Sequence, residues 1–256
     1  MDNEAVYDKY DWSKINHDFL KGKIEKIIDW IPNDVKSIVD IGCGNGIITN
    51  VLGDFYDVTG VDRSTNALKS VQTKKIASGA DSIPLDNHEF DLVFSSELLE
   101  HLDDEVLLGA VSEIKRLSKK YIFITVPNDE NPDKLSIRCP ECNYTYNSPN
   151  HLRRFKVQNF KELFPEYKIL KTLAFGSKVR YYNPTILKLK KNLTPPSAWV
   201  PKYWVEESKR DTVCPNCEHE FNYPYRFNPI ATVLDVINVV ISPKKPSWLF
   251  VLMEKY

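Results

Sequence analysis

Short runs of β-branched and other apolar residues alternate with longer amphipathic stretches between Val35 and Phe123. The runs are typical of buried strands, and the stretches place apolar residues at helical spacing. The expected strands are 37–41, 57–61, 90–95 and 121–126, and the expected helices are 47–55, 64–75 and 104–117. Strands joined by helices of this length form right-handed βαβ units and a parallel sheet with helices on both faces. The sequence therefore predicts an α/β fold.

The chain continues on both sides of this pattern. An amphipathic helix is expected at 14–31, a further helix at 157–163 and a strand at 167–175, and an apolar run at 248–253 is expected to close the sheet. Two stretches, Pro127–Asn150 and Lys178–Pro246, interrupt the pattern and are expected to be irregular insertions. The resulting division is a core with an N-terminal helical cap (1–130), a first insertion (131–150), continued core (151–177), a second insertion (178–245) and a closing strand (246–256).

Charge and hydrophobicity exclude several classes of protein. The 256 residues carry 34 Lys and Arg against 35 Asp and Glu, so no overall charge attracts the chain to nucleic acid or to an anionic membrane. A hydrophobic content of 42% excludes global disorder. The acidic N-terminus is not followed by an apolar stretch, and no uninterrupted apolar run is long enough to cross a membrane. We therefore expect a cytoplasmic protein with no membrane partner.

A glycine-rich turn follows the first expected strand. The segment Val39–Gly46 reads VDIGCGNG, and Asp62 ends the next strand. Glycines at such a turn let a ligand lie against bare backbone, and an acidic residue at this distance binds the ribose hydroxyls of a nucleoside in many α/β folds. The dinucleotide motif GxGxxG is absent because position 47 is Ile.

These segments resemble the class I S-adenosylmethionine-dependent methyltransferases, whose glycine loop has the form [DE]xGxGxG. Residues 79–85 (GADSIPL) resemble the loop that contacts adenine in that family, and residues 90–102 resemble its fourth strand and the segment after it. The resemblance implies a Rossmann-like, seven-stranded, mostly parallel sheet and S-adenosylmethionine as the cofactor.

The resemblance also implies a role for each matching residue. Most of the expected cofactor contacts surround the methionine and ribose parts, and the remainder face adenine or the sulfonium; they are Asp40, Gly42, Cys43, Gly44, Gly46, Asp62, Arg63, Ala80, Asp81 and Ser95. Asp62 would hold the ribose, Ala80 and Asp81 would face adenine, and Ser95 would lie near the sulfonium. We interpret Cys43 as a small packing side chain rather than a nucleophile.

The other four cysteines form two CPxC pairs, Cys139/Cys142 and Cys214/Cys217. Each pair places two thiolates on one tight turn, and two such turns supply the four ligands of a structural zinc site. Similar aromatic and polar runs follow both pairs, as in paired ribbon hairpins. We therefore predict a zinc-ribbon-like insertion that binds Zn²⁺ structurally.

The stretch 178–210 is basic and contains interleaved aromatic residues. Such a stretch could bind an anionic or carbohydrate acceptor, or it could be a lid whose aromatics pack on the zinc module. The sequence leaves both interpretations open.

Two histidines are candidates for a general base. The segment N-H-L-R-R-F at 150–155 is similar to a His-x-x-x-Phe segment that borders the acceptor pocket in many small-molecule methyltransferases, which points to His151. His101, after the fourth strand, is the competing candidate.

Together these features predict a methyltransferase that acts on oxygen or nitrogen of a small molecule or glycan precursor. An RNA methyltransferase that holds RNA with its zinc module, and a cofactor-binding module without turnover, are the alternatives. No NPPY-like motif for amide methylation follows the fourth strand, where SSEL stands at 95–98. The oligomeric state is not predicted.

Overall fold

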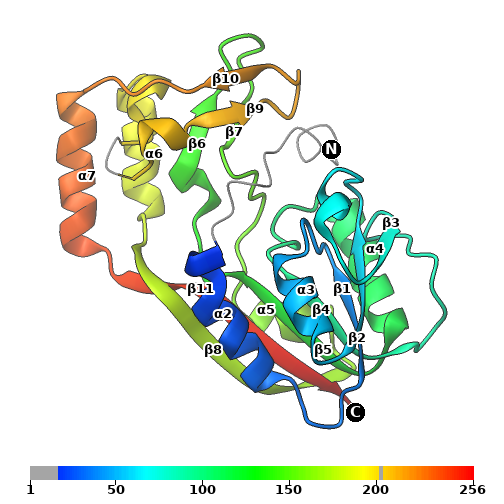
Figure 1. Ribbon diagram of the computed structural model, residues 1–256. Helices are drawn as coiled ribbons and strands as arrows, with labels where there is room; N and C mark the ends of the chain where they lie inside the picture. The colour runs from blue at the N-terminus through cyan, green and yellow to red at the C-terminus, as the bar shows by residue number, and fades with distance from the viewer. Residues whose placement is uncertain (1–16, 202–203) are drawn as a thin grey trace.

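A computed structural model describes residues 17–201 and 204–256. Its main sheet has seven strands in the order β3-β2-β1-β4-β5-β11-β8 (Figure 1). The strands are β1 (Ser37–Ile41), β2 (Asp57–Asp62), β3 (Lys74–Ala77), β4 (Phe90–Ser96), β5 (Ser118–Pro127), β8 (Tyr167–Arg180) and β11 (Lys244–Lys255). β11 runs antiparallel to both β5 and β8, whereas β1 to β5 are parallel to one another. The predicted Rossmann-like α/β fold is confirmed.

Helices cover both faces of this sheet because consecutive strand residues alternate between two cores. On one face, Val39, Val93 and Ile122 pack with α4 (Asp104–Leu117) and α5 (Val157–Leu163). On the other, their neighbours Ile38, Leu92 and Tyr121 pack with α2 (His17–Trp30) and α3 (Ile47–Gly53). The alternation places one apolar side chain of each pair in each core.

The insertions form a separate group of elements beside the sheet (Figure 1). Two short hairpins, β6–β7 (Ser136–Arg138 and Thr145–Asn147) and β9–β10 (Asp211–Val213 and Glu220–Asn222), carry the two cysteine pairs. Helix α6 (Pro184–Leu193) lies beside the hairpins, and α7 (Pro229–Ile241) packs against α6 on its outer side. Short 3₁₀ turns complete the insertions at η3 (Pro132–Leu135), η4 (Pro196–Ala198) and η5 (Glu207–Lys209).

Two expectations about secondary structure are wrong. Residues 64–75 were expected to be a helix but form the 3₁₀ turn η2 (Ala67–Ser70) followed by the start of β3. β3 is the edge strand, and its exposed Lys74 and Lys75 give it the polar character of a surface helix. Val71, the extended residue that follows the turn, buries its side chain beside Gly46.

The stretch 178–246 is not irregular either, because β8 extends to Arg180, β11 begins at Lys244, and α6 and α7 lie between them. Both helices begin with Asn-Pro. The Asn183 side chain accepts hydrogen bonds from the amides of Thr185 and Ile186, and Asn228 accepts one from Ala231. An Asn N-cap followed by Pro at the first helical position is a helix-start signal that the sequence carried.

Candidate active site

The glycine loop lies at the carboxyl end of β1. Gly42, Gly44 and Gly46 have φ angles of 77°, 54° and 77°, a region that favours glycine. A Cβ atom on Gly42 would lie 2.9 Å from the methyl carbons of Leu98, so the loop also needs glycine there for space. The three glycines thus hold the turn in the conformation that exposes its backbone.

Asp62 at the end of β2 is fixed against this loop. Its Oδ2 accepts a hydrogen bond from the amide of Gly44 at 2.8 Å, and its Oδ1 accepts one from the amide of Ser64 at 2.9 Å. The carboxylate therefore lies beside the glycine loop, as the sequence predicts for the residue that binds ribose.

Asp40 is buried beneath the same loop. Its Oδ2 accepts a hydrogen bond from the Thr49 hydroxyl at 2.7 Å, whereas its buried Oδ1 has no hydrogen-bond partner among the described residues. Burial raises the pKa of Asp40 to about 7, and the charge of Asp62 adds to the shift, against the opposing effect of the Thr49 hydrogen bond. A buried acceptor without a donor fits a ligand that brings one, such as the ammonium group of S-adenosylmethionine. The residues present therefore fit this cofactor.

The residues expected near adenine gather beside the Asp62 end of the loop. Ala80 packs against the core under α4, and a Cβ atom on Gly109 of α4 would lie 2.6 Å from the Cβ of Asp81. Burial lowers the pKa of Arg63, and the nearby charge of Asp81 opposes this shift. Arg63 and Asp81 therefore lie close enough to interact.

Ser95 and Cys43 have packing roles in the structure. The buried Ser95 hydroxyl donates to the carbonyl of Ile41 at 2.9 Å and so braces β4 against β1; its contact with the cofactor stays a prediction. Burial, with the charges of Asp40 and Asp62, raises the pKa of the Cys43 thiol. A protonated thiol is a poor nucleophile, which supports the interpretation of Cys43 as a packing side chain.

A second group of ionisable side chains follows β4 and β5. We call it the acid–histidine cluster, and it comprises Glu97, Glu100, His101, Glu130 and His151. The rings of His101 and His151 meet edge to face, with centroids 4.8 Å apart. The amide of Leu152 donates to the carbonyl of Glu100 at 2.7 Å, which joins the two segments of the cluster. Leu98, inside the first segment, packs beside Gly42, so the cluster adjoins the glycine loop.

His151 is paired with a carboxylate. Its Nδ1 lies 2.5 Å from Glu130 Oε2, so Nδ1 carries the proton and Nε2 presents a lone pair. Burial by itself would lower the pKa of His151, but the hydrogen bond to Glu130 and the charges of Glu130, Glu100 and Glu97 outweigh burial and raise it. His151 is therefore oriented and polarised as a proton acceptor.

His101 is in a different state. Burial, together with the nearby His151, lowers its pKa to about 3, so its ring is neutral. Its Nδ1 faces the carbonyl of Asn150 at 3.3 Å and therefore carries the proton. A group with this pKa is a weak base, so the geometry favours His151 over His101.

Glu100 is a buried acid that the sequence did not single out. Its carboxyl group has no hydrogen-bond partner among the residues that the structure describes, and its Oε1 lies 3.8 Å from His101 Nε2. Burial and the charge of Glu97 raise the pKa of Glu100 to about 8. Ligand atoms of Glu100, His101 and His151 all lie within 4.8 Å of one another, so these side chains could share a proton or hold a divalent cation.

Helix α2 contributes a cation to the same region. The buried Lys23 places its Nζ 2.9 Å from Glu97 Oε1, which also accepts a hydrogen bond from Thr125 at 3.2 Å. Lys23, the segment 97–100 and Glu130 lie far apart in the sequence, so no local pattern indicated that their side chains meet.

The four cysteines of the CPxC pairs meet as predicted. Cys139 Sγ lies 3.7 Å from Cys217 Sγ, and Cys142 Sγ lies 3.6 Å from Cys214 Sγ. All four are free thiols, and these distances are too long for disulfides. A tetrahedral Zn²⁺ with bonds of about 2.3 Å would separate its sulfur atoms by about 3.8 Å, so the cluster fits this ion.

The tight turns that carry the two CPxC pairs have the same backbone geometry. Asn143 and Glu218, which follow the second cysteine of each pair, have φ angles of 61° and 58°. Their amides donate to the carbonyls of Cys139 and Cys214 at 3.1 and 2.8 Å. This repetition confirms the expected pair of ribbon hairpins.

Most of the cations in the basic stretch 178–210 that the structure describes have internal partners. Lys190 Nζ is buried 2.7 Å from Asp235, and Arg210 donates to the carbonyls of Val200, Pro201 and Val205. Trp199 is buried as well, with its indole N–H donated to Thr194. These contacts favour the interpretation as a lid packed on the cysteine module; Lys202 and Tyr203 lie outside the described residues.

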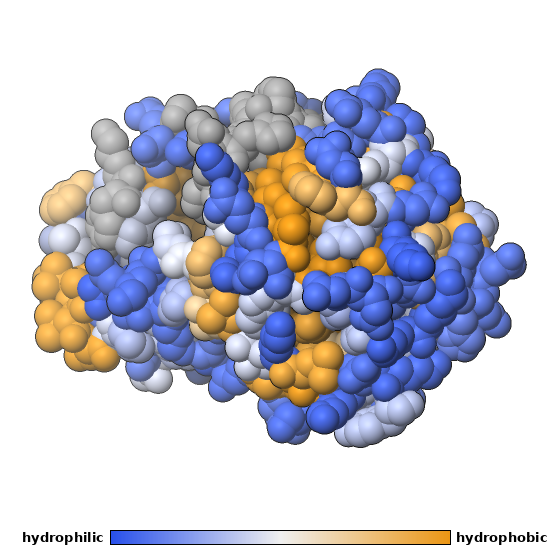
Figure 2. All heavy atoms as spheres, turned by 60° about the horizontal axis from the view of Figure 1, so that its bottom comes forward, coloured by the Kyte–Doolittle hydropathy of each residue, from blue (hydrophilic) through white to orange (hydrophobic). Residues whose placement is uncertain are grey.

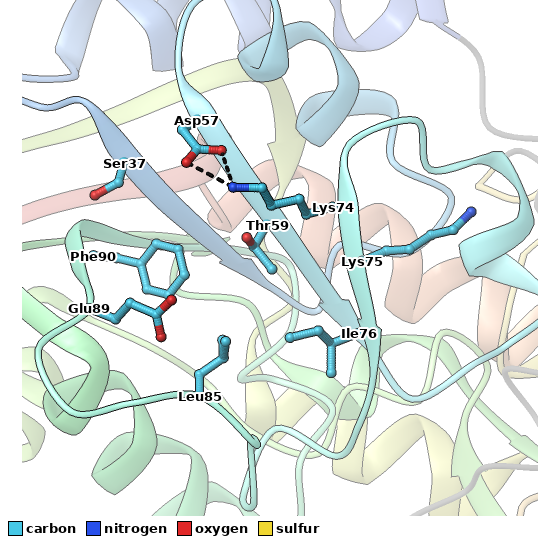
Figure 3. A pocket seen from close by; sticks show the side chains of 9 residues that line it. All are labelled: Ser37, Asp57, Thr59, Lys74, Lys75, Ile76, Leu85, Glu89 and Phe90. Atoms are coloured by element: carbon cyan, nitrogen blue, oxygen red, sulfur yellow. Dashed lines mark hydrogen bonds and ion pairs between the residues drawn. The ribbon is translucent and has the colours of Figure 1, made fainter.

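A hollow also lies at the opposite, amino end of the sheet strands (Figure 3). It is lined by Ser37, Asp57, Thr59, Lys74, Lys75, Ile76, Leu85, Glu89 and Phe90. The ion pair between Asp57 and Lys74, at 2.9 Å, crosses its rim. Ligands of open α/β sheets bind at the carboxyl ends of strands, so this hollow is separate from the cofactor site.

Comparison with known proteins agrees with this geometry. A family model described as a methyltransferase domain matches residues 39–123. The chain is 30% identical over 118 residues to a ubiquinone biosynthesis O-methyltransferase of Aromatoleum aromaticum, a match that covers 39% of this chain and 49% of that protein. It is 27% identical over 166 residues to an uncharacterized protein of Methanocaldococcus jannaschii, covering 60% of this chain and 71% of that one.

Solved structures share the fold. A SAM-dependent methyltransferase from Archaeoglobus fulgidus is 19% identical, with a TM-score of 0.56 over 94% of this chain and 95% of its own. A putative methyltransferase from Bacillus halodurans is 11% identical, with a TM-score of 0.56 over 91% and 98% of the two chains. The methyltransferase domain matched at 39–123, the shared fold and the glycine loop support a class I S-adenosylmethionine-dependent methyltransferase.

Proposed function

We propose that the chain methylates a hydroxyl group of a small molecule and that His151 is the general base. The observation that carries this proposal is the pairing of His151 Nδ1 with Glu130, which leaves Nε2 to accept a proton. The bound cofactor would supply a methyl group on a sulfonium, an excellent leaving group. The chain must then orient the acceptor, exclude water and remove the hydroxyl proton.

The surrounding residues support these roles of the cofactor and of His151. Glu130 fixes the His151 tautomer and would stabilise the imidazolium that forms when the proton arrives. Asp40 and Asp62 would hold the ammonium and ribose ends of the cofactor at the carboxyl ends of β1 and β2. The names of the ubiquinone biosynthesis O-methyltransferases among the relatives support an oxygen acceptor in this chain as well.

The experiment compares variants for release of S-adenosylhomocysteine with a panel of phenols, catechols, sugars, nucleotides and RNAs. His151→Ala should lower turnover by about 10²–10⁴-fold with cofactor affinity nearly unchanged. His88→Ala is the matched control, because His88 is an exposed histidine that precedes β4 at the amino end of the sheet. Full activity of the His151 variant would overturn the assignment of the base.

The same panel separates the alternatives. A chain with a net charge of −1 that does not use RNA as its substrate should lose bound RNA as the salt concentration rises. Turnover on RNA together with salt-resistant binding would therefore favour the RNA methyltransferase. Loss of turnover on addition of a chelator, with the zinc retained, would instead assign Glu100, His101 and His151 to a bound divalent cation. Absence of turnover on the whole panel would favour the non-catalytic module.

We also propose that Cys139, Cys142, Cys214 and Cys217 bind one structural Zn²⁺. The cluster leaves no open position for substrate, since four thiolates complete a tetrahedron. A small hydrophobic core that includes Ile137, Tyr146, Val200 and Tyr223 surrounds the cysteines, so the ion would hold together hairpins from two separate insertions.

A further inference from the structure

Helix α7 has an unusual distribution of side chains. Aliphatic residues at helical spacing face outward; they are Ile230, Val233, Val236, Ile237, Val240 and Ile241, which we call the α7 stripe. The exposed fractions of Val233, Val236 and Val240 are 59%, 58% and 78%. Figure 2 shows hydrophobic side chains gathered at the left end of the molecule, the end that α7 occupies in Figure 1.

The inward face of α7 combines the apolar Ala231 and Leu234 with two buried polar side chains that are hydrogen-bonded, Asp235 and Asn238. Asp235 accepts hydrogen bonds from the Tyr182 hydroxyl at 2.8 Å and from Lys190 at 2.7 Å. Asn238 accepts from the amide of Asn183 at 2.9 Å and donates to the carbonyl of Tyr181 at 3.1 Å. Rotation of the helix to bury the stripe would break these buried hydrogen bonds, so the fold holds the stripe outward.

The charge near the stripe that is not engaged in ion pairs is positive, because the acids that face α6 and β11 there, Asp133 and Asp129, pair with Lys191 and Lys245. Residues 178–205 contain no acid, and the only acid in residues 221–253 is Asp235, which is buried against Lys190. Lys178, Lys188 and Lys244 are exposed, and no ion pair joins them to another described residue. Lys178 and Lys244 lie on the β8–β11 ribbon at the C-terminal end of α7, and Lys188 lies on α6 beside it. The chain-wide charge of −1 therefore hides a local cationic rim.

We propose that the α7 stripe docks on an anionic lipid bilayer, with its aliphatic side chains in the interfacial region and the cationic rim on the headgroups. An apolar helix face flanked by lysines is suited to this position. No described helix has the length and the apolar content needed to cross a bilayer. With 13 residues and one apolar face, α7 is suited to lie in the membrane surface. Two copies joined through the same face would bring their cationic rims together, and this repulsion makes a bilayer the better partner.

The stripe lies on the outer side of the insertions, away from the glycine loop (Figure 1). Docking would therefore leave the cofactor site open while it placed the enzyme beside acceptors dissolved in the bilayer. The docking does not depend on which atom the enzyme methylates.

The test is flotation of the whole chain with vesicles of phosphatidylcholine containing about one-third phosphatidylglycerol, and with phosphatidylcholine alone. We expect binding to the anionic vesicles that weakens with salt, and at least tenfold loss of binding in the Val236→Asp/Val240→Asp variant. Leu108→Asp is the matched control, because Leu108 is an exposed aliphatic residue on α4, at 67% exposure. A Lys188→Gln/Lys244→Gln variant should bind less tightly and respond less to salt.

Unchanged cofactor affinity in each variant shows that it is folded. Absence of flotation with anionic vesicles, or equal loss of binding in Leu108→Asp, would overturn the proposal. Concentration-dependent dimers that Val236→Asp/Val240→Asp dissociates, in a chain that does not float, would assign the stripe to a second copy instead.

Discussion

The amide of Gly44 donates a hydrogen bond to Asp62 Oδ2 at 2.8 Å, so one carboxylate joins the carboxyl end of β2 to the glycine loop that follows β1. The same carboxylate is the expected ligand of the ribose hydroxyls. Cofactor affinity and loop geometry therefore depend on one side chain.

Asp62→Ala should weaken S-adenosylmethionine binding by about 1.5–3 kcal/mol, the range for charge-assisted hydrogen bonds. Isothermal titration calorimetry measures the change. Asp57→Ala is the control, because Asp57 begins the same strand and forms an exposed ion pair with Lys74. Unchanged affinity in Asp62→Ala would refute the assignment of the ribose contact.

Glu130→Gln should move the acidic limb of the kcat/KM profile to lower pH. Glu130 helps to raise the pKa of His151, and a general base is active only when it is unprotonated. Removal of the negative charge lowers that pKa, so the neutral imidazole persists to lower pH. Turnover on the plateau should fall as well, since the amide fixes the tautomer less firmly. A limb that stays in place, or moves to higher pH, would contradict the role of His151.

Metal analysis of the purified chain should find one zinc ion per chain, lost in Cys142→Ser and retained in Cys43→Ser. Chelation should expose the hairpins β6–β7 and β9–β10 to protease while the main sheet survives, because the sheet's two cores contain none of these cysteines. A native protein without zinc, or one with a disulfide among the four cysteines, would show that the cluster has another purpose.

Asp235→Ala should destabilise the chain by about 3–5 kcal/mol, measured by denaturant unfolding, because it leaves the fully buried Lys190 without its counter-charge. The double variant Lys190→Met/Asp235→Leu should recover much of this loss, since it removes both charges. Asp133→Ala, which breaks the surface ion pair with Lys191, should cost little. Equal effects of Asp235→Ala and Asp133→Ala would refute the importance of burial.

The sequence predicted those parts of the molecule whose signal is local. Helices α4 and α5 have the predicted bounds, and the six sheet strands other than β3 differ from the prediction mainly at their ends. The cysteine cluster was predictable because CPxC spacing places both thiolates of a pair on one tight turn. The positions of Asp40 and Asp62 were predictable because each lies at or near the end of a strand.

The remaining features depend on contacts between distant segments. β3 was missed because an edge strand buries few of its side chains and so carries a weak apolar pattern. Of the residues of β3, only Ile76 packs against the core. Glu130 reaches His151 only through the fold of the loop between β5 and α5, and Lys23 reaches Glu97 from α2. The outward α7 stripe opposes the usual hydrophobic pattern, and the buried hydrogen bonds of Asp235 and Asn238 explain its direction.

Arg180 and Lys244 are paired neighbours on β8 and β11, so residues 181–243 leave the sheet and return to it at one point. A tight turn could in principle replace this excursion and leave the sheet as an ordinary hairpin. Such a deletion would nevertheless remove Cys214 and Cys217, the partners of Cys139 and Cys142. These two cysteines belong to the loop that also carries Glu130 and His151. The excursion can therefore be removed without breaking the sheet, yet it supports the loop that carries the proposed base. A chain trimmed there should keep its sheet and bind cofactor, while His151 loses its fixed position.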